Sequence, residues 1–442
     1  MQDDEDKVTN AEVRKHTLSM LTERVAEGIE TRLKWMLDPD SLTAEQRRAF
    51  EDLPPDERPR PLTAHDRPLA EEWLSSVTSN KIELTDRIKS GASVVLATCS
   101  IAATITDTVR DPGDMFDWVI VEEAAKAWPT EVVIPLVLGS RWTLIGDHRQ
   151  LGAHREEEVG QFLASLRDHA DKDMRQHFEE RRERERVLKM FGHLFDDLAA
   201  AEDGTTAAVS HNAVPLGRLT LQFRMHRTIA EPVGRAFYPL EPPVLDDDGL
   251  PKSFLDTSAM ADVDHGVTRP APLKNRPLVW VDTAGLDDCV EEPFWFNLGE
   301  VGLIDRLVDR MRPAPLATPL PQDEPDGLVV LTPYRAQKRL LENKDLLRGR
   351  VHTAHSFQGR EADRVIVSLV RTTRTGNTVS GNIGHVGRQE VANVLLSRAR
   401  RLLVVVGNFG HFAENGGSRW EIVTSTIKRH GVVVPGEEIA ER

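Results

Sequence analysis

Short apolar runs alternate with amphipathic stretches through most of the chain after residue 90. Runs of four or five apolar residues are typical of strands buried on both faces, and the amphipathic stretches between them are typical of helices that cover a parallel sheet. We expect strands over Val94–Thr98, Trp118–Val121, Trp142–Ile145, Leu278–Val281, Leu328–Leu331, Val365–Leu369 and Leu402–Val406, with helices at about 298–312 and 335–347. The pattern predicts an α/β fold of two lobes, each with a parallel sheet flanked by helices.

The chain before residue 90 is polar and has a helical pattern. Apolar residues recur every three to four positions between Val13 and Ile29, and a second helix is expected over about Leu69–Lys89. A charged stretch at about 155–205 carries one apolar stripe, which predicts a helical insertion that docks through that stripe. We therefore expect a helical arm over 1–90, a first lobe over 91–215 that contains the insertion, and a second lobe over 216–442.

The composition excludes several classes of protein. A length of 442 residues with 40% hydrophobic and 29% charged residues excludes a mainly disordered chain and allows two to four domains. No apolar run approaches about 18 residues, and the first residues lack the basic start and apolar stretch of a secretory signal. Cys99 and Cys289 are the only cysteines, too few for a disulfide framework or a zinc cage. We expect a cytoplasmic protein.

The charge is uneven along the chain. The net charge of −15 argues against a general polycation that coats nucleic acid. Residues 331–442, however, contain 18 lysines and arginines against 10 acids. This excess indicates either a local phosphate-binding surface or the ordinary scatter of solvated charge.

Polar side chains follow two of the expected strands in the first lobe. Glu122 and Glu123 come directly after Trp118–Val121, at the end of a parallel strand where open α/β sheets bind ligands. In phosphoryl-transfer sites one such acid holds Mg²⁺ and its neighbour polarises water, whereas the alternative is a helix N-terminus that favours acids. The next strand ends in Gly146-Asp147, and Gln150 follows. An amide there can orient water or sense a terminal phosphate, unless the segment is a plain exit from the strand.

The second lobe contains four further candidate segments. Arg224, between Phe223 and Met225, is either a donor to transition-state charge or a surface charge. Thr332 and the following residues through Gln337 indicate either a phosphate-binding helix start or a proline-capped one. The stretch 351–361 has small polar residues and a glycine that allow close backbone approach. Arginines recur at 398 and 400, so one can face a ligand while the other packs.

Taken in order, these segments resemble the motifs of superfamily 1 helicases, most closely the branch of RNA and DNA motors that includes the nonsense-mediated-decay helicase. The matching segments are ATCS at 97–100, EEAA at 122–125, GDHRQL at 146–151, QFRMH at 222–226, TPYRAQ at 332–337, SFQGRE at 356–361 and LLSRAR at 395–400. The resemblance covers about 92 to 410. It implies two RecA-like lobes, with ATP in the cleft between them and single-stranded DNA or RNA across the top.

The resemblance also implies a role for individual residues. Glu122 would hold Mg²⁺, Glu123 would be the catalytic base, and Gln150 would contact the γ-phosphate and the attacking water. Arg224 and Arg398 would be arginine fingers. Others implied at the nucleotide are Gly146, Asp147, Gln222, Phe223 (near the base), Gly359 and Glu361 (near the ribose). Those implied at the nucleic acid are Thr98, Thr332, Tyr334, Thr353 and Ser356.

The chain departs from the family pattern at the phosphate-binding loop. That loop, G-x-x-x-x-G-K-[ST], supplies the lysine and hydroxyl that hold the β/γ-phosphates and Mg²⁺, and this chain contains no Gly-Lys pair. In the family the loop precedes the ATCS segment, so the first lobe is expected to lack its first strand. Glu122 stands where the family has Asp, and Gln150-Leu151-Gly152-Ala153 replaces QLPP.

Two hypotheses follow. The chain is the motor portion of an ATP-dependent helicase, with the missing loop on an upstream segment or a partner polypeptide. Alternatively it is a non-hydrolysing nucleic-acid-binding or scaffolding relative. Whether this chain alone hydrolyses ATP stays open. A third class, a small-molecule α/β enzyme, is disfavoured because no G-x-G-x-x-G segment follows a strand.

Overall fold

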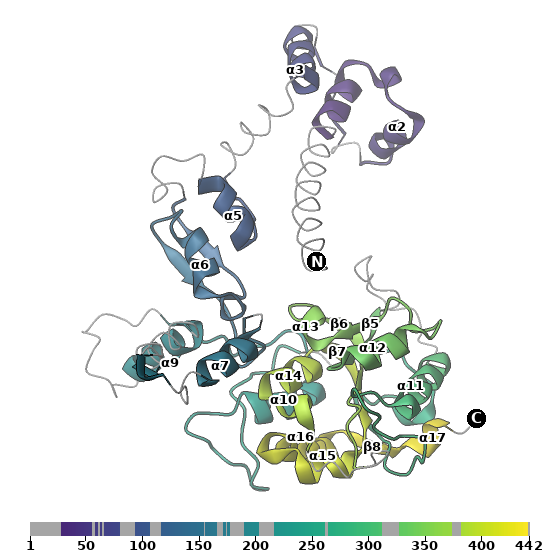
Figure 1. Cartoon of the computed structure of the whole chain (residues 1–442). Coiled ribbons are helices and arrows are strands. Elements are labelled where there is room, and N and C mark those ends of the chain that lie inside the picture. The colour runs from purple at the N-terminus through teal and green to yellow at the C-terminus, as the bar shows by residue number, and fades with distance from the viewer. Residues whose placement is uncertain are drawn as a thin grey trace. The chain divides into compact units, whose positions relative to one another are not determined.

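The computed structural model describes residues 28–54, 58–60, 62–63, 66–79, 93–106, 116–153, 155–165, 171–173, 175–176, 190–202, 216–260, 264–311, 327–373 and 382–440. The chain divides into two compact units, Met1–Thr98 and Cys99–Arg442 (Figure 1). Within the described residues, no helix combines the length and the apolar character needed to cross a membrane.

The first unit contains short helices. Residues 28–37 are helical, and η1 (Pro39–Ser41), α2 (Ala44–Glu51) and α3 (Arg67–Ser79) follow. The helix expected over Leu69–Lys89 is present as α3 up to Ser79. The remainder of that prediction, and almost all of the stripe from Val13 to Ile29, lie outside the described residues.

The strand expected over Val94–Thr98 is wrong. These residues belong to no strand, and the side chains of Val94 and Leu96 are exposed. An apolar run becomes a strand only where a neighbouring strand completes its backbone hydrogen bonds. Among the described residues no strand pairs with this run, so its composition alone was misleading.

The second unit begins with a small parallel sheet. β1 (Val119–Val121) pairs with β2 (Trp142–Leu144), as predicted, with Ile120 opposite Thr143. Around these strands lie α5 (Cys99–Thr106), η3 (Ala124–Lys126), α6 (Pro129–Leu136), α7 (Glu156–Ser165) and α9 (Met190–Glu202). The last two lie in the predicted insertion, and Phe191 of α9 packs on the small core of Val121, Ala124 and Val132.

A six-stranded parallel sheet forms the rest of this unit. Its strands are β3 (Leu278–Asp282), β4 (Leu328–Thr332), β5 (Val351–Thr353), β6 (Ala362–Ser368), β7 (Ala399–Gly407) and β8 (Val432–Pro435), in the spatial order β5-β4-β6-β7-β3-β8. The four strands predicted here are confirmed. The patterns of β5 and β8 were too short to identify.

Helices cover both faces of this sheet (Figure 1). Alternate residues of each strand point to opposite faces, so that Trp280 belongs to one apolar core and Val279 and Val281 to the other. The first core is covered by α10 (Arg227–Phe237), α13 (Ala354–Phe357), α14 (Gln389–Leu396), α15 (Phe409–Asn415) and α16 (Gly417–His430); the second is covered by α11 (Leu298–Arg310), α12 (Arg335–Glu342) and α17 (Gly436–Ala440). The predicted fold class, α/β with parallel sheets flanked by helices, is confirmed.

Candidate functional site

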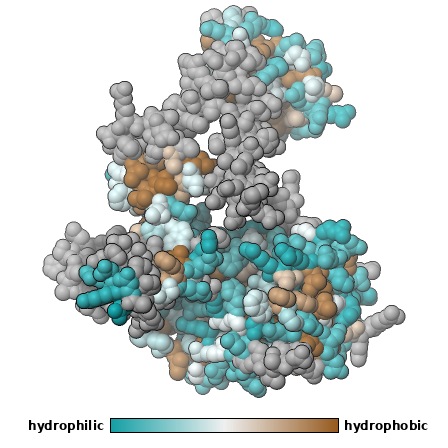
Figure 2. All heavy atoms as spheres, viewed as in Figure 1, coloured by the Kyte–Doolittle hydropathy of each residue, from teal (hydrophilic) through white to brown (hydrophobic). Residues whose placement is uncertain are grey.

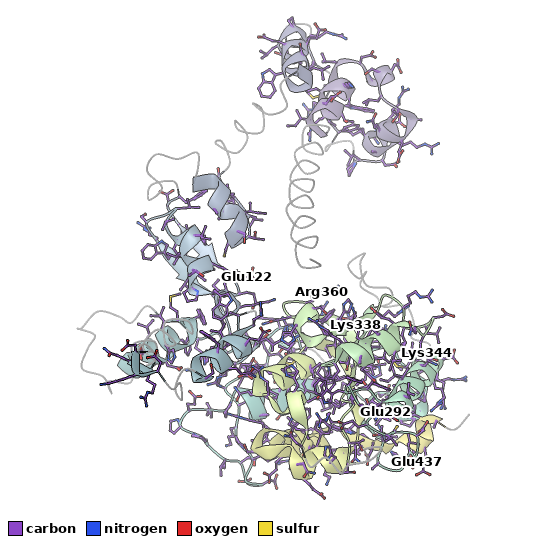
Figure 3. All side chains as sticks on the ribbon, in the orientation of Figure 1. Glu122, Glu292, Lys338, Lys344, Arg360 and Glu437 are labelled. Atoms are coloured by element: carbon purple, nitrogen blue, oxygen red, sulfur yellow. The ribbon has the colours of Figure 1, made fainter. Side chains whose placement is uncertain are left out.

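The two acids lie on a tight turn after β1. Glu123 has a left-handed backbone (φ 56°) and precedes η3, and the Ala124 N–H donates to the Ile145 carbonyl at 2.8 Å. This bond places the acidic turn against the end of β2. A Cβ built on Gly146 would lie 2.8 Å from the backbone nitrogen of Ala125, so only glycine fits there. Glu122, labelled in Figure 3, is exposed, and the neighbouring Glu123 is half-buried.

Asp147 organises the segment after β2. One of its carboxylate oxygens accepts from the Arg149 N–H at 2.9 Å. The other accepts from the side-chain amide of Gln150 at 2.8 Å and from the hydroxyl of Tyr238. Burial and the neighbouring Asp147 carboxylate raise the pKa of Tyr238, which therefore stays a hydrogen-bond donor to Asp147.

Gln150 connects this segment to Arg398. Arg398 Nη2 donates to Gln150 Oε1 at 3.0 Å and to Ser397 Oγ at 2.7 Å. Only 1% of the Arg398 side chain is exposed. Burial and the nearby Arg224 guanidinium lower the pKa of Arg398 to about 10, which still leaves it charged at neutral pH. Its Nε is buried and has no hydrogen-bond partner in the described structure.

Arg224 lies beside the same segment. Its Nε donates to Glu361 Oε2 at 2.7 Å, and its Nη1 lies 3.5 Å from the Ser397 carbonyl. The Gln222 side chain fixes this turn, since its Oε1 accepts from the Arg224 N–H at 3.1 Å and its Nε2 donates to the Met225 carbonyl at 2.8 Å. The ring of Phe223 is 67% exposed.

Gly359 faces Glu123. It has a left-handed backbone (φ 81°), and a Cβ built on it would lie 3.8 Å from Glu123 Oε1. The neighbouring Gln358 donates to the Leu151 carbonyl at 3.0 Å. The site therefore joins the carboxyl ends of β1 and β2 to the amino ends of β6 and β7.

The structure thus brings together most of the residues predicted for the nucleotide. They form one connected cluster through the contacts described above: Glu123, Gly146, Asp147, Gln150, Gln222, Arg224, Gly359, Glu361 and Arg398. Glu122 and Phe223 lie on the same segments as members of this cluster, but they are exposed, and among the described residues their side chains form no hydrogen bond or ion pair with it.

Four of the residues predicted for nucleic acid lie near the carboxyl ends of β4 and β5. Thr332 and Thr353 are paired in the sheet register. Thr332 is fully buried, and its hydroxyl lies 3.5 Å from the Tyr334 N–H. Thr353 caps α13, since its hydroxyl accepts from the Ser356 N–H at 3.3 Å. Thr98, the last residue of the first unit, is exposed.

Sequence reasoning missed three residues of this site: Arg149, Tyr238 and Asn393. Asn393, fully buried on α14, donates to the Arg149 carbonyl at 3.0 Å and to the Tyr238 hydroxyl at 2.8 Å. Arg149 donates to the Phe237 carbonyl at 3.0 Å and pairs with Glu241. The available signal was position: Arg149 lies inside the GDHRQL segment, and Asn393 lies two residues before LLSRAR.

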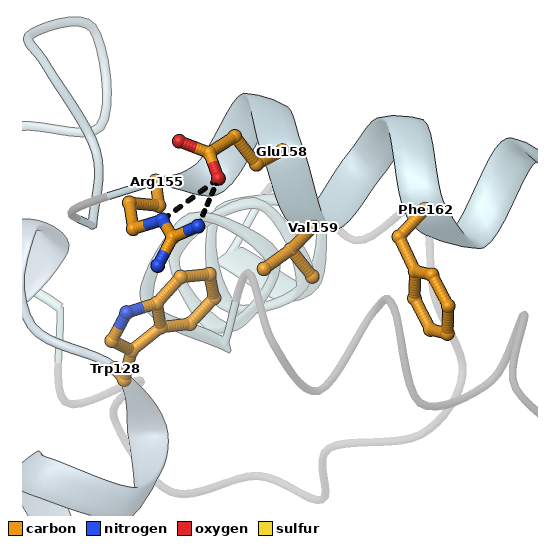
Figure 4. A pocket seen from close by; sticks show the side chains of 5 residues that line it. All are labelled: Trp128, Arg155, Glu158, Val159 and Phe162. Atoms are coloured by element: carbon orange, nitrogen blue, oxygen red, sulfur yellow. Dashed lines mark hydrogen bonds and ion pairs between the residues drawn. The ribbon is translucent and has the colours of Figure 1, made fainter. Parts of the chain in front are cut away.

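A pocket of about 470 Å³ lies elsewhere on the first lobe. It is lined by Trp128, Arg155, Glu158, Val159 and Phe162, and Arg155 pairs with Glu158 (Figure 4). None of the residues predicted for chemistry lines it, so we do not assign it to the site.

The donor set of the cluster fits a polyanion. Arg398 is charged and buried with an unpartnered Nε, and Arg224 lies close enough to lower its pKa. Two neighbouring guanidinium groups repel each other, and phosphate oxygens between them would relieve that repulsion. The described residues contain no group of three His, Cys, Asp or Glu that could hold a metal. A single carboxylate such as Glu122 fits Mg²⁺, which takes one or two carboxylates together with substrate phosphates.

Comparison with known proteins identifies the family. Two family models, both described as "AAA domain", match residues 5–154 and 194–410. A regulator of nonsense transcripts 1 homolog of Arabidopsis thaliana is 25% identical over 365 residues, which are 79% of this chain and 24% of that protein. DNA-binding protein SMUBP-2 of Rattus norvegicus is 26% identical over 335 residues, 72% of this chain and 27% of that protein. Over most of its length the chain is therefore similar to helicases of the branch that includes the regulators of nonsense transcripts.

The resemblance seen in the motifs is therefore confirmed at the level of this helicase family. An uncharacterized ATP-dependent helicase of Methanocaldococcus jannaschii is 24% identical over 76% of the chain and 43% of that protein. The chain spans about a quarter to two fifths of the length of these relatives. The crystal structure of arterivirus nonstructural protein 10 (helicase), 14% identical, covers 65% of this chain and 38% of its own; its TM-score of 0.26 is too low to support a statement about the fold.

Proposed function

We propose that this chain forms part of a helicase motor that couples ATP hydrolysis to movement along single-stranded DNA or RNA. The observation that carries the proposal is the hydrogen bond between Arg398 and Gln150, with Gln150 bonded in turn to Asp147. A site with a purely structural role needs no buried arginine held against a glutamine at the ends of four strands. A site that must respond to a terminal phosphate does.

Each side chain of the cluster has a task in this proposal. Glu123 accepts a proton from the attacking water, and Gln150 orients that water. Arg398 and Arg224 donate to the charge that develops on the transferred phosphoryl group. Glu122 would hold Mg²⁺, which when bound neutralises phosphate charge. Asp147, Tyr238 and Asn393 hold the Gln150 segment in place.

Movement would arise because the same bonds join the two lobes. Gln150 and Asp147 follow β2, whereas Arg398 and Tyr238 belong to the six-stranded lobe. A ligand that replaces one of these bonds changes how the lobes are held together. We propose that ATP binding and hydrolysis alternate between these arrangements. Thr98, Thr353 and Ser356 would contact the nucleic acid, while the buried Thr332 and Tyr334 would support that surface from beneath.

A phosphate-binding loop must complete this site. The chain has no Gly-Lys pair, and we propose that a G-x-x-x-x-G-K-[ST] segment from elsewhere on a longer chain or from a partner polypeptide supplies it. The same absence favours the second candidate function, a relative that binds nucleic acid without hydrolysing ATP.

The deciding experiment measures ATP turnover by the 442-residue chain with and without single-stranded oligonucleotide, before and after addition of a polypeptide that carries the missing loop. We expect oligonucleotide-stimulated turnover only when both are present, and its loss in Glu123→Gln. Oligonucleotide binding without turnover under all conditions would favour the non-hydrolysing relative. Turnover that Glu123→Gln leaves intact would contradict the assigned site.

A further inference from the structure

An exposed turn carries two aromatic side chains in a strained backbone. Phe294 and Trp295, here called the aromatic tip, have φ values of 70° and 63°, and their side chains are 81% and 54% exposed. The left-handed region is unfavourable for bulky side chains, and burial of apolar surface does not compensate for it here. Strain of this kind in a native protein points to a functional constraint on the position of the side chains.

The turn is closed by its own backbone. The Glu292 N–H donates to the Phe296 carbonyl at 2.8 Å, and the Trp295 N–H donates to the Glu292 carbonyl at 3.1 Å. These bonds leave the two aromatic residues at the outermost positions of the turn. The tip is therefore a defined structure that holds both rings out toward solvent.

Buried polar contacts anchor both sides of the turn. Before the tip, Arg371 Nε donates to Glu291 Oε2 at 3.0 Å, with both side chains 9% exposed. After it, Asn297 and Gln337 bond reciprocally: the Asn297 N–H donates to Gln337 Oε1 at 2.9 Å, and Gln337 Nε2 donates to the Asn297 carbonyl at 3.2 Å. A rigid support under exposed rings is what stacking against a flat ligand requires.

The surroundings of the tip indicate the chemistry of that ligand. The ring of Trp295 stacks on Tyr334, with centroids 6.0 Å apart and an interplanar angle of 29°. Tyr334 is followed directly by α12, which has Arg335, Lys338 and Arg339 in its first two turns. Lys338 is labelled in Figure 3. Aromatic rings beside a basic helix match the bases and phosphates of single-stranded nucleic acid, whereas a purely apolar protein partner would not need the basic residues.

We propose that Phe294 and Trp295 form a platform on which bases of single-stranded nucleic acid stack, while α12 contacts the adjacent phosphates. Tyr334 supports the platform from beneath. This inference rests on the proposed function, because it assumes that nucleic acid lies near the carboxyl ends of β4 and β5. It adds a base-contacting element at a segment outside all seven helicase-like motifs.

The test compares oligonucleotides with and without bases. Fluorescence anisotropy measures the binding of three fluorescein-labelled strands. They are an oligothymidylate of about 15 nucleotides, the corresponding oligouridylate, and an abasic strand of equal length. The proteins are the natural chain, Phe294→Ala/Trp295→Ala, Trp295→Tyr and a control, Trp73→Ala. Trp73, on α3, is 55% exposed and so matches Trp295 in exposure.

We expect the double variant to bind the base-containing strands at least roughly tenfold more weakly. Its affinity for the abasic strand should be unchanged, and Trp295→Tyr and Trp73→Ala should bind like the natural chain. Unchanged binding by the double variant, or an equal loss for abasic and base-containing strands, would overturn the platform while leaving nucleic-acid binding intact. Failure of the natural chain to bind any strand would instead overturn the proposed function, and the platform with it.

Discussion

The guanidinium of Arg398 donates to the side-chain amide of Gln150 at 3.0 Å, across 248 positions of sequence. The same amide donates to Asp147, so a single glutamine links the loop after β2 to the start of β7. A charged group buried to this degree is costly to keep, because it has lost most of its hydration. This cost is consistent with our proposal that the site is held ready for an anionic ligand.

Replacing Arg398 with methionine should cost little stability. Burial and the adjacent Arg224 lower the pKa of Arg398 to about 10, which means that the charged side chain opposes folding at neutral pH. Removing this buried charge offsets the loss of its hydrogen bonds. We therefore expect the free energy of unfolding, measured with urea, to change by less than about 1 kcal/mol. ATP turnover by the completed motor should fall by about 10³-fold or more.

Arg371→Met is the matched control for that substitution. Arg371 is also a buried arginine, but it is paired with Glu291 at 3.0 Å. Breaking this pair leaves a buried carboxylate alone, with an expected loss of about 3–5 kcal/mol. If Arg398→Met destabilised the chain as much as Arg371→Met does, the hydrogen bonds of Arg398 to Gln150 and Ser397 would be structural and the assigned role would be wrong.

Gly146→Ala should displace the acidic turn. The added Cβ would lie 2.8 Å from the Ala125 nitrogen and 3.0 Å from the ring of Phe191, so the backbone must shift. We expect the free energy of unfolding, measured with urea, to fall by about 1–3 kcal/mol, and the completed motor to lose ATP turnover. Gly160→Ala on α7 is the control, because its Cβ meets nothing within 4 Å and alanine favours the helix. Equal stability of the two variants would contradict the close contact of Gly146 with Ala125 and Phe191.

Tyr238→Phe removes one hydroxyl from between the lobes. That hydroxyl donates to Asp147 and accepts from Asn393 Nδ2 at 2.8 Å, so its loss removes one hydrogen bond from each of these groups. Asp147 keeps its bond from Gln150, and Asn393 keeps its bond to the Arg149 carbonyl. We expect the free energy of unfolding, measured with urea, to fall by about 1–3 kcal/mol. Asn393→Ala should then lower the free energy of unfolding less in the Tyr238→Phe variant than in the natural chain, because the two residues share one hydrogen-bond network. Additive losses would show that they act independently.

Much of this fold was predictable because its strands are continuous apolar runs. Val279 and Val281 pack on one face of the sheet and Trp280 on the other, so the buried part of β3 had to be apolar, and that pattern is visible in sequence. Val94–Thr98 has a similar composition, but no strand in the described part of the chain pairs with it. Pairing depends on residues distant in sequence, which a local pattern does not report.

The site was predictable only where a residue lies in a recognisable segment. Gln150 and Arg398 lie in such segments and are in contact. Of the residues that support them, Tyr238 has no local signature, and Asn393 is indicated only by its position two residues before LLSRAR. The aromatic tip was missed for a related reason. Its left-handed backbone is imposed by the anchors on either side, so the sequence around Phe294 and Trp295 gives no sign of it.

The stability of the second lobe should fall as the pH rises through a window set by Glu300. This side chain is fully buried at the start of α11, where it accepts from Ser368 Oγ at 2.6 Å and from the Val370 N–H. Burial raises the pKa of Glu300 from 4.5 to about 8. Between these values the folded chain keeps a proton that the unfolded chain has lost, so this contribution to stability is complete below about pH 4.5 and is lost as the pH approaches 8.

Glu300→Gln isolates this effect, because the amide does not titrate in that range. The free energy of unfolding of the variant, minus that of the natural chain, should increase from pH 5 to pH 8 by at most about 4 kcal/mol. Urea unfolding at several pH values measures the difference directly. A difference that stays constant with pH would mean that Glu300 has the same affinity for protons in the folded and unfolded chain. A decrease would mean that the bonds from Ser368 and Val370 outweigh burial and keep the carboxylate ionised.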